Sequence, residues 1–220
     1  MYKYFVQPIL NKYNQTLIGY ELLLKQHTTA GWQTPASFTT IPPTIIADLL
    51  FEVTSQLKLK IGSLSLNLNR SQMIDPEVIS TLLIVQDQLR PVRIKIEITE
   101  EDTIANIEND QLIPILQRFS DHGMEISLDD VGSGRNLLAQ IKQLLPYVQE
   151  IKFALQNFES TIHDPLMQAQ VIFWRNFADQ HKLRFILEGI ENADDDELVD
   201  SMKIDLRQGY FYGKPHLLAC

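Results

Sequence analysis

The sequence predicts an α/β fold, a (β/α) barrel of the TIM type. Short strand-like segments alternate with longer helix-like segments along the chain, which is typical of a parallel sheet with helical crossovers. At least six such units occur within 220 residues, and this favours a closed barrel over an open doubly wound sheet. No repeat or Gly/Ser-rich linker divides the chain, so we expect one barrel domain over residues 1–220.

The first two strands are expected at residues 1–10 and 16–25, on either side of a turn-like segment, which is the pattern of a hairpin. Strands and helices then alternate. Further strands are expected at 63–69, 92–97, 125–129, 149–153, 184–188 and 203–208. Helices are expected at 44–59, 76–88, 110–122, 136–145, 166–180 and 194–201.

Two of these strands alternate strictly between aliphatic and polar residues. In 63–69 leucines alternate with serine and asparagine, and in 94–99 isoleucines alternate with Lys95, Glu97 and Thr99. Because successive side chains of a strand point to opposite faces, the aliphatic sets would lie under the helices and the polar sets inside the barrel. An unpaired buried charge is very costly, so these groups need partners.

Polar residues also recur late in the strands, and in a barrel the late positions form the C-terminal face, where active sites lie. Hard oxygen ligands without cysteine or clustered histidine indicate Mg²⁺, Mn²⁺ or Ca²⁺ rather than zinc. The residues in this pattern are Asn67, Glu97, Asp129 with Asp130, Glu188 and Gln208.

The composition excludes several classes of protein. A net charge of −9 disfavours binding to a nucleic-acid polymer or an anionic membrane. The one cysteine, Cys220, allows neither a disulfide within the chain nor a thiolate zinc site. There is no signal-peptide pattern and no apolar run of the ~20 residues that span a bilayer. We therefore expect a cytoplasmic protein without membrane insertion.

The same residues lie in motifs that resemble the EAL family of bacterial cyclic di-GMP phosphodiesterases. The order of the motifs, and the 20-residue step from Glu188 to Gln208, carry the resemblance. The motifs are Phe-Val-Gln-Pro-Ile at 5–9, Gly-Tyr-Glu-Leu-Leu at 19–23, Ser-Leu-Asn-Leu at 65–68, Glu-Ile-Thr-Glu at 97–100, Asp-Asp-Val-Gly-Ser-Gly at 129–134, Glu-Gly-Ile-Glu at 188–191 and Gln-Gly-Tyr-Phe-Tyr-Gly-Lys-Pro at 208–215.

The resemblance implies a barrel whose first strand is antiparallel to the others, and a site for two Mg²⁺ or Mn²⁺ ions. It implies that Gln208 lies at or near the metals, that Lys152 lies near the attacking water, and that Glu100 braces the loop of the two aspartates. The ligands that it implies are Glu21, Asn67, Glu97, Asp129 and Glu188 for one ion, and Asp129 with Asp130 for the other.

By the same resemblance the chain would hydrolyse cyclic di-GMP to the linear dinucleotide pGpG, with a homodimer as a possible assembly. Ca²⁺ is expected to inhibit, because it would bind the same oxygens but prefers longer and looser coordination. Gln7, Lys25 and Gln208 would bind the substrate, and Lys152, Glu21, Glu188 and Gln208 would be catalytic. The chain departs from the family at Lys25, where arginine is usual. It departs again at Ala154, where aspartate is usual, and in the loop 131–138. These departures favour an alternative, a receptor of low or no activity that binds cyclic di-GMP or a protein partner.

Overall fold

The computed structural model of the chain describes residues 1–57, 60–99, 107–134 and 136–218. Among these residues, eight strands form a closed barrel, and a ninth, β3 (Gly31–Gln33), extends the sheet beside β2. The barrel strands are β1 (Tyr2–Asn11), β2 (Thr16–Thr28), β4 (Ser63–Leu68), β5 (Arg93–Ile98), β6 (Glu125–Leu128), β7 (Glu150–Ala154), β8 (Arg184–Glu188) and β9 (Leu206–Arg207).

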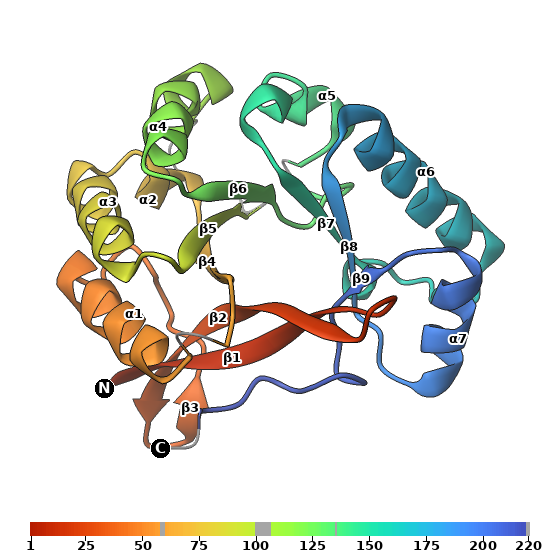
Figure 1. Cartoon of the computed structure of the whole chain (residues 1–220), viewed down its shortest axis with the longest axis horizontal. Coiled ribbons are helices and arrows are strands. Elements are labelled where there is room, and N and C mark those ends of the chain that lie inside the picture. Colours follow the sequence, from red (N-terminus) through yellow and green to blue (C-terminus); the bar gives the residue numbers. More distant parts are fainter. Residues whose placement is uncertain (58–59, 100–106, 135, 219–220) are drawn as a thin grey trace.

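The first strand runs against its two neighbours in the barrel. β1 is antiparallel to β2 and to β9. The remaining neighbours are parallel: β4 pairs with β2, and each strand from β5 to β9 pairs with the strand before it in the chain. The β1–β2 pairing closes the ring (Figure 1). The prediction of a TIM-type barrel with an antiparallel first strand is therefore confirmed.

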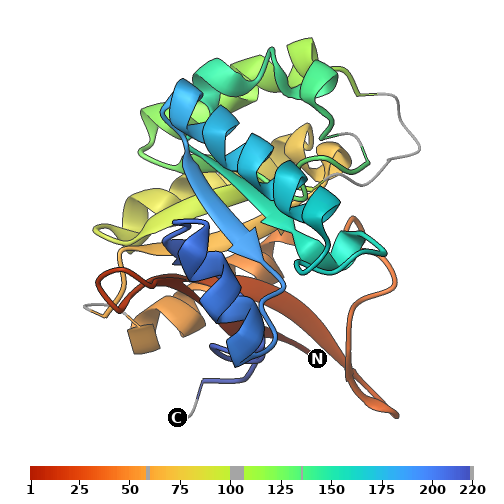
Figure 2. The same cartoon turned by 90° about the vertical axis from the view of Figure 1, so that its right-hand side faces the viewer.

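The helices lie around the outside of the strands (Figure 1), and α6 runs alongside β8 (Figure 2). Asp75 and Asp164 cap α3 and α6, each followed by proline, the combination that starts a helix. Asn192 caps α7, whose acidic first turn suits the positive end of the helix dipole. The helices are α1 (Pro43–Leu57), α2 (Arg70–Met73), α3 (Pro76–Leu89), α4 (Asn109–Asp121), α5 (Leu138–Ile141), α6 (Pro165–His181) and α7 (Ala193–Ser201).

The barrel interior contains paired charges, as the alternating pattern predicted. Isoleucines of β5 are buried on the helix side, while Lys95 is 3% exposed on the other face. Its Nζ atom lies 2.6 and 2.7 Å from the two carboxylate oxygens of Glu150. Arg184 donates to the same carboxylate at 3.0 Å. These contacts satisfy the charges at the N-terminal end of the barrel.

Two predicted elements are shorter in the structure. The expected helix 136–145 is wrong, because only Leu138–Ile141 are α-helical before a 3₁₀ turn at Leu145–Tyr147. Asn136 lies outside that helix, and its side chain donates to the backbone carbonyls of Ile98, at the end of β5, and of Asp129. The expected strand 203–208 shrinks to Leu206–Arg207, because Lys203 has a left-handed φ of 56° that interrupts extended backbone.

In the described part of the chain no helix is long and apolar enough to cross a membrane.

Candidate functional site

A single buried lysine lies among four carboxylates at the C-terminal end of the barrel. Lys152 of β7 is fully buried, and its Nζ atom lies 2.9 Å from Glu97, 3.5 Å from Glu21 and 3.7 Å from Asp129. It also forms an ion pair with Glu188. These residues come from four other strands or strand ends, so the barrel brings together groups that are far apart in the sequence.

The strand register explains this convergence. Glu97 lies opposite Asn67 on the neighbouring strand, and Glu188 ends β8 opposite Ala154. Parallel strands of a barrel end at one face, so residues late in each strand meet there. Glu21 lies in the middle of the long β2, but β2 pairs with β4 only from Gly19 to Leu22. Glu21 is therefore also at the end of the barrel part of its strand.

Two amide side chains hold the carboxylate of Glu21. Asn67 donates to one oxygen at 2.7 Å, and Gln208 donates to the other at 2.5 Å. Gln208 can reach this position because the next residue, Gly209, packs directly on the backbone of Ile190. A Cβ atom on Gly209 would lie 2.0 Å from the Ile190 carbonyl oxygen. Gly209, in the motif at 208–215, thus permits the segments that follow β8 and β9 to approach closely.

The acidic residues influence one another's ionisation. Burial raises the pKa of Glu97 to about 8, and the negative charges of neighbouring carboxylates add to the rise. Burial raises the pKa of Asp129 to about 7, with the charge of Asp130 as a further cause. Burial likewise raises the pKa of Glu188 well above its ordinary value. The site therefore contains more negative charge than one ammonium group balances.

Glu21 and Lys152 show the opposite effect. Burial acts against the charge of Glu21, but Lys152 and the two amide donors outweigh it and keep the pKa of Glu21 below its ordinary value. Burial also acts against the charge of Lys152, but the carboxylates, Glu188 foremost, raise its pKa well above the ordinary value. These carboxylates thus favour the positively charged form of Lys152 in the metal-free site.

The donor atoms fit divalent cations. Buried oxygens of Asn67, Glu97 and Gln208 accept no hydrogen bond within the described residues. Asp129, Asp130 and Glu188 each offer an oxygen within 4.8 Å of the other two. Unpaired buried oxygens in a negatively charged site are typical of a place for a hard cation such as Mg²⁺ or Mn²⁺. The predicted ligands therefore form one cluster.

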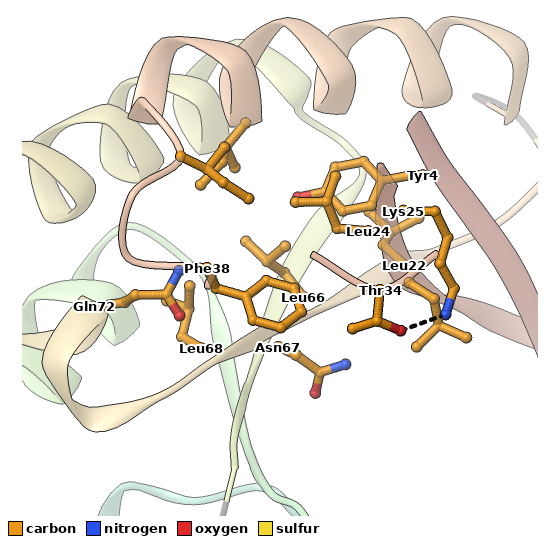
Figure 3. A pocket seen from close by; sticks show the side chains of 13 residues that line it. Tyr4, Leu22, Leu24, Lys25, Thr34, Phe38, Leu66, Asn67, Leu68 and Gln72 are labelled. Atoms are coloured by element: carbon orange, nitrogen blue, oxygen red, sulfur yellow. Dashed lines mark hydrogen bonds between the residues drawn. The ribbon is translucent and has the colours of Figure 1, made fainter. Parts of the chain in front are cut away.

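Two predicted substrate-binding residues lie on β1 and β2, the strand pair that contains Glu21. Gln7 is opposite Glu21 in the β1–β2 pairing, and its amide donates to the Gly213 carbonyl at 3.3 Å. Figure 3 shows Lys25 turned toward Thr34, to which it donates at 2.9 Å, beside a cavity of about 90 Å³ that Asn67 also lines. The predicted brace Glu100 lies outside the described residues.

The raised pKa values predict how the stability of the metal-free protein changes with pH. Glu97 and Asp129 have higher pKa values in the folded protein than in the unfolded chain, so they bind protons more tightly in the folded state. Their ionisation therefore destabilises the folded state. We expect the melting temperature in EDTA to fall as pH rises from about 5 to about 8.5, since the folded state holds more protons over that window. Mn²⁺ should remove this fall by binding the ionised oxygens. A metal-free melting temperature that rises across this window would contradict the expectation.

The family of the chain follows from its comparison with known proteins. The EAL domain family model matches residues 2–215. The chain belongs to the EAL domain family. It is 32% identical over 155 residues to the cyclic di-GMP phosphodiesterase PdeR of Escherichia coli K12, covering 69% of this chain and 22% of that protein. The chain thus spans less than half the length of the curated relatives it matches first.

Solved structures of other EAL domains share the fold. The PaMucR phosphodiesterase in complex with c-di-GMP superposes with a TM-score of 0.80 at 24% identity, over 98% of this chain and 96% of that one. An EAL domain protein from Listeria monocytogenes EGD-e gives a TM-score of 0.79 at 22% identity, over 98% and 88% of the two chains. At these identities the similarity establishes the barrel fold of this EAL domain.

One residue of the site was missed by reasoning from the sequence. Asn136 is fully buried and donates from its amide to the carbonyls of Ile98 and Asp129. The sequence placed it in a helix. The signal that could have found it was an asparagine shortly after a Gly-Ser-Gly turn, since asparagine commonly binds nearby backbone groups in loops.

Proposed function

We propose that this EAL domain, residues 1–220, is a metal-dependent phosphodiesterase that hydrolyses cyclic di-GMP to pGpG. The observation that carries the proposal is the cluster of four carboxylates and two amides around the buried Lys152. The family supports the choice of substrate, because relatives such as PdeR of E. coli carry the name of cyclic di-GMP phosphodiesterases.

Two Mg²⁺ or Mn²⁺ ions would be held in this site. When bound, such ions supply Lewis acidity and an activated water, and they neutralise a phosphodiester. The unpaired oxygens of Asn67 and Glu97, and the close set of Asp129, Asp130 and Glu188, support this assignment. Glu21 would complete the ligand set, oriented by its two amide donors.

Lys152 would act as a charged hydrogen-bond donor. In the metal-free site the neighbouring carboxylates raise its pKa well above the ordinary value, which favours the charged form. A fixed ammonium group at this position would orient an oxygen of the reacting phosphate or water and stabilise negative charge that develops there. The substrate would be bound by Gln7, Lys25 and Gln208. Lys25 would offer a point charge, whereas the arginine that is usual in the family can form bidentate hydrogen bonds.

The alternative is a receptor that binds the dinucleotide or a protein partner without turnover. Ala154 favours it, because this small residue pairs with Glu188 where the family usually has aspartate. Lys25 favours it too, since its amine is bound to Thr34 at 2.9 Å. The proposed ligands are all retained, and for this reason we prefer the enzyme.

We expect the purified protein to hydrolyse cyclic di-GMP in the presence of Mg²⁺ or Mn²⁺. We expect this hydrolysis to cease when Ca²⁺ replaces those ions. Calcium prefers longer and looser coordination with more ligands, so it would occupy the oxygens in the wrong geometry. Chromatographic detection of pGpG in each metal, with an EDTA control, measures this. Binding of cyclic di-GMP without metal-stimulated turnover would favour the receptor.

The homodimer stays a prediction, which light scattering of the purified chain would check.

A further inference from the structure

We propose that Asn136 is the positioning residue that holds the two ends of the metal site together, the end of β5 and the start of the Asp129–Asp130 segment. This inference rests on the proposed function, because it concerns the same site. It gives a residue after the Gly-Ser-Gly turn a role of the same kind as the one that the family resemblance implies for Glu100. The argument starts from the hydrogen bonds of one buried amide.

The Nδ2 atom of Asn136 donates to two carbonyls, one at the end of β5 and one directly after the end of β6. One is Ile98, at 3.1 Å, the residue directly after Glu97. The other is Asp129 itself. The regular β5–β6 pairing ends at Ile98 opposite Leu128, so these bonds lie just beyond the end of the ladder. A single amide thus ties together the backbone beside one proposed ligand and the backbone of another.

Backbone hydrogen bonds also connect Asn136 to the preceding turn. Gly132 donates to the Asn136 carbonyl at 3.1 Å, and Asn136 donates to the Ser133 carbonyl at 3.0 Å. Asp130 has a left-handed φ of 52°, a conformation that a non-glycine residue adopts at some cost. A strained residue keeps its conformation only where the surrounding contacts determine it, and the amide of Asn136 is one of those contacts.

Burial makes this contact strong. Asn136 is 0% exposed, so its amide is shielded from water. The Ile98 carbonyl also accepts from the Asp129 amide at 3.1 Å, so loss of the Asn136 donor would affect mainly the Asp129 carbonyl. Leaving a buried carbonyl unpaired is unfavourable, and the segment would shift to satisfy it. Because Asp129 and Asp130 are consecutive, such a shift would move oxygens of both proposed sites. Residues that orient ligands in this way typically change metal affinity ~10–100-fold when lost.

The other end of β5 offers a matched control. Gln86 of α3 is also buried, at 1% exposure, and also ties an amide to the backbone. It donates to the Val92 carbonyl at 3.0 Å and accepts from the Ile94 amide at 2.6 Å. This contact lies at the start of the strand, away from the proposed ligands. The variants Asn136→Leu and Gln86→Met each keep most of the side-chain volume and remove the donors.

The test is Mn²⁺ binding to the full chain by calorimetry, without substrate, together with hydrogen exchange of the metal-free protein. We expect Asn136→Leu to raise the Mn²⁺ dissociation constant ~10–100-fold and to speed exchange of the Asp129, Val131 and Gly132 amides. Asn136→Ser, which keeps one donor, should recover part of the affinity. Gln86→Met should speed exchange at Ile94, and its Mn²⁺ affinity should equal that of the parent.

The two readouts separate the possible failures. Unchanged Mn²⁺ affinity in Asn136→Leu, or an equal loss in Gln86→Met, would overturn the positioning role, as would unchanged exchange at residues 129–132. A parent protein that binds no Mn²⁺ would instead remove the proposed function. In that case the exchange comparison still decides whether Asn136 holds the segment.

Discussion

Replacing Lys152 with methionine should destabilise the metal-free protein strongly and make its stability depend on Mn²⁺. Lys152 is the cation that four buried carboxylates share. Removing one partner of a buried ion pair typically costs about 3–5 kcal/mol, because the remaining charge is left uncompensated. In a chain of this size that corresponds to a fall in melting temperature of roughly 10 °C. Mn²⁺ should recover most of it, since it supplies the missing positive charge.

Lys95→Met is the matched control for this effect. Lys95 is equally buried in the barrel, but its carboxylate partner, Glu150, keeps Arg184 at 3.0 Å. We expect a smaller loss of stability and no recovery with Mn²⁺, because this carboxylate lies at the opposite end of the barrel from the proposed metal site. Thermal unfolding at pH 8 in EDTA and in Mn²⁺ measures both variants. Equal rescue of the two by Mn²⁺ would show that the ion acts elsewhere.

Glu97→Ala should abolish turnover of cyclic di-GMP at every metal concentration. The side chain is 0% exposed, contacts Lys152 at 2.9 Å and has a second oxygen free for a cation. Loss of a ligand removes several kcal/mol of charge stabilisation in the transition state, which corresponds to ~10³-fold or more in rate. A metal titration of turnover measures this. Activity that returns at high Mn²⁺ would show that Glu97 is not a ligand.

The same titration tests the role predicted for the other acid of this motif. Glu100 is expected to brace the loop of the two aspartates, so Glu100→Ala should weaken turnover and raise the metal requirement by ~10–100-fold. Excess metal should restore part of the rate. If Glu100→Ala is inactive at saturating metal while Glu97→Ala recovers, the two roles are reversed.

Much of the site could be predicted from local sequence alone. The period-two alternation around Asn67 and Glu97 predicted which side chains face the barrel interior, and both lie there. The position of Glu188 at the end of its strand was predicted to the residue. Such predictions succeed because side-chain direction in a strand depends only on the neighbouring backbone, and strand ends of a barrel share one face.

The partners of these groups were decided only by the tertiary structure. Lys95 pairs with Glu150 across 55 residues, and Gln208 holds Glu21 across 187 residues. The raised pKa values of Glu97 and Asp129 arise from burial and from charges on other strands. No local pattern encodes these quantities, because each depends on the distance between segments that only the closed barrel brings together.

Asn136 illustrates the difference between what local sequence predicts and what the tertiary structure decides. The sequence predicted a helix that begins at residue 136. In the folded chain its amide instead satisfies the carbonyls of Ile98 and Asp129, which are buried where two strands end. The sequence by itself determined the barrel, the side chains that face its interior and the family. Tertiary structure decided which polar groups pair inside the barrel, because a buried carbonyl or carboxylate must find its partner among whatever the fold places beside it.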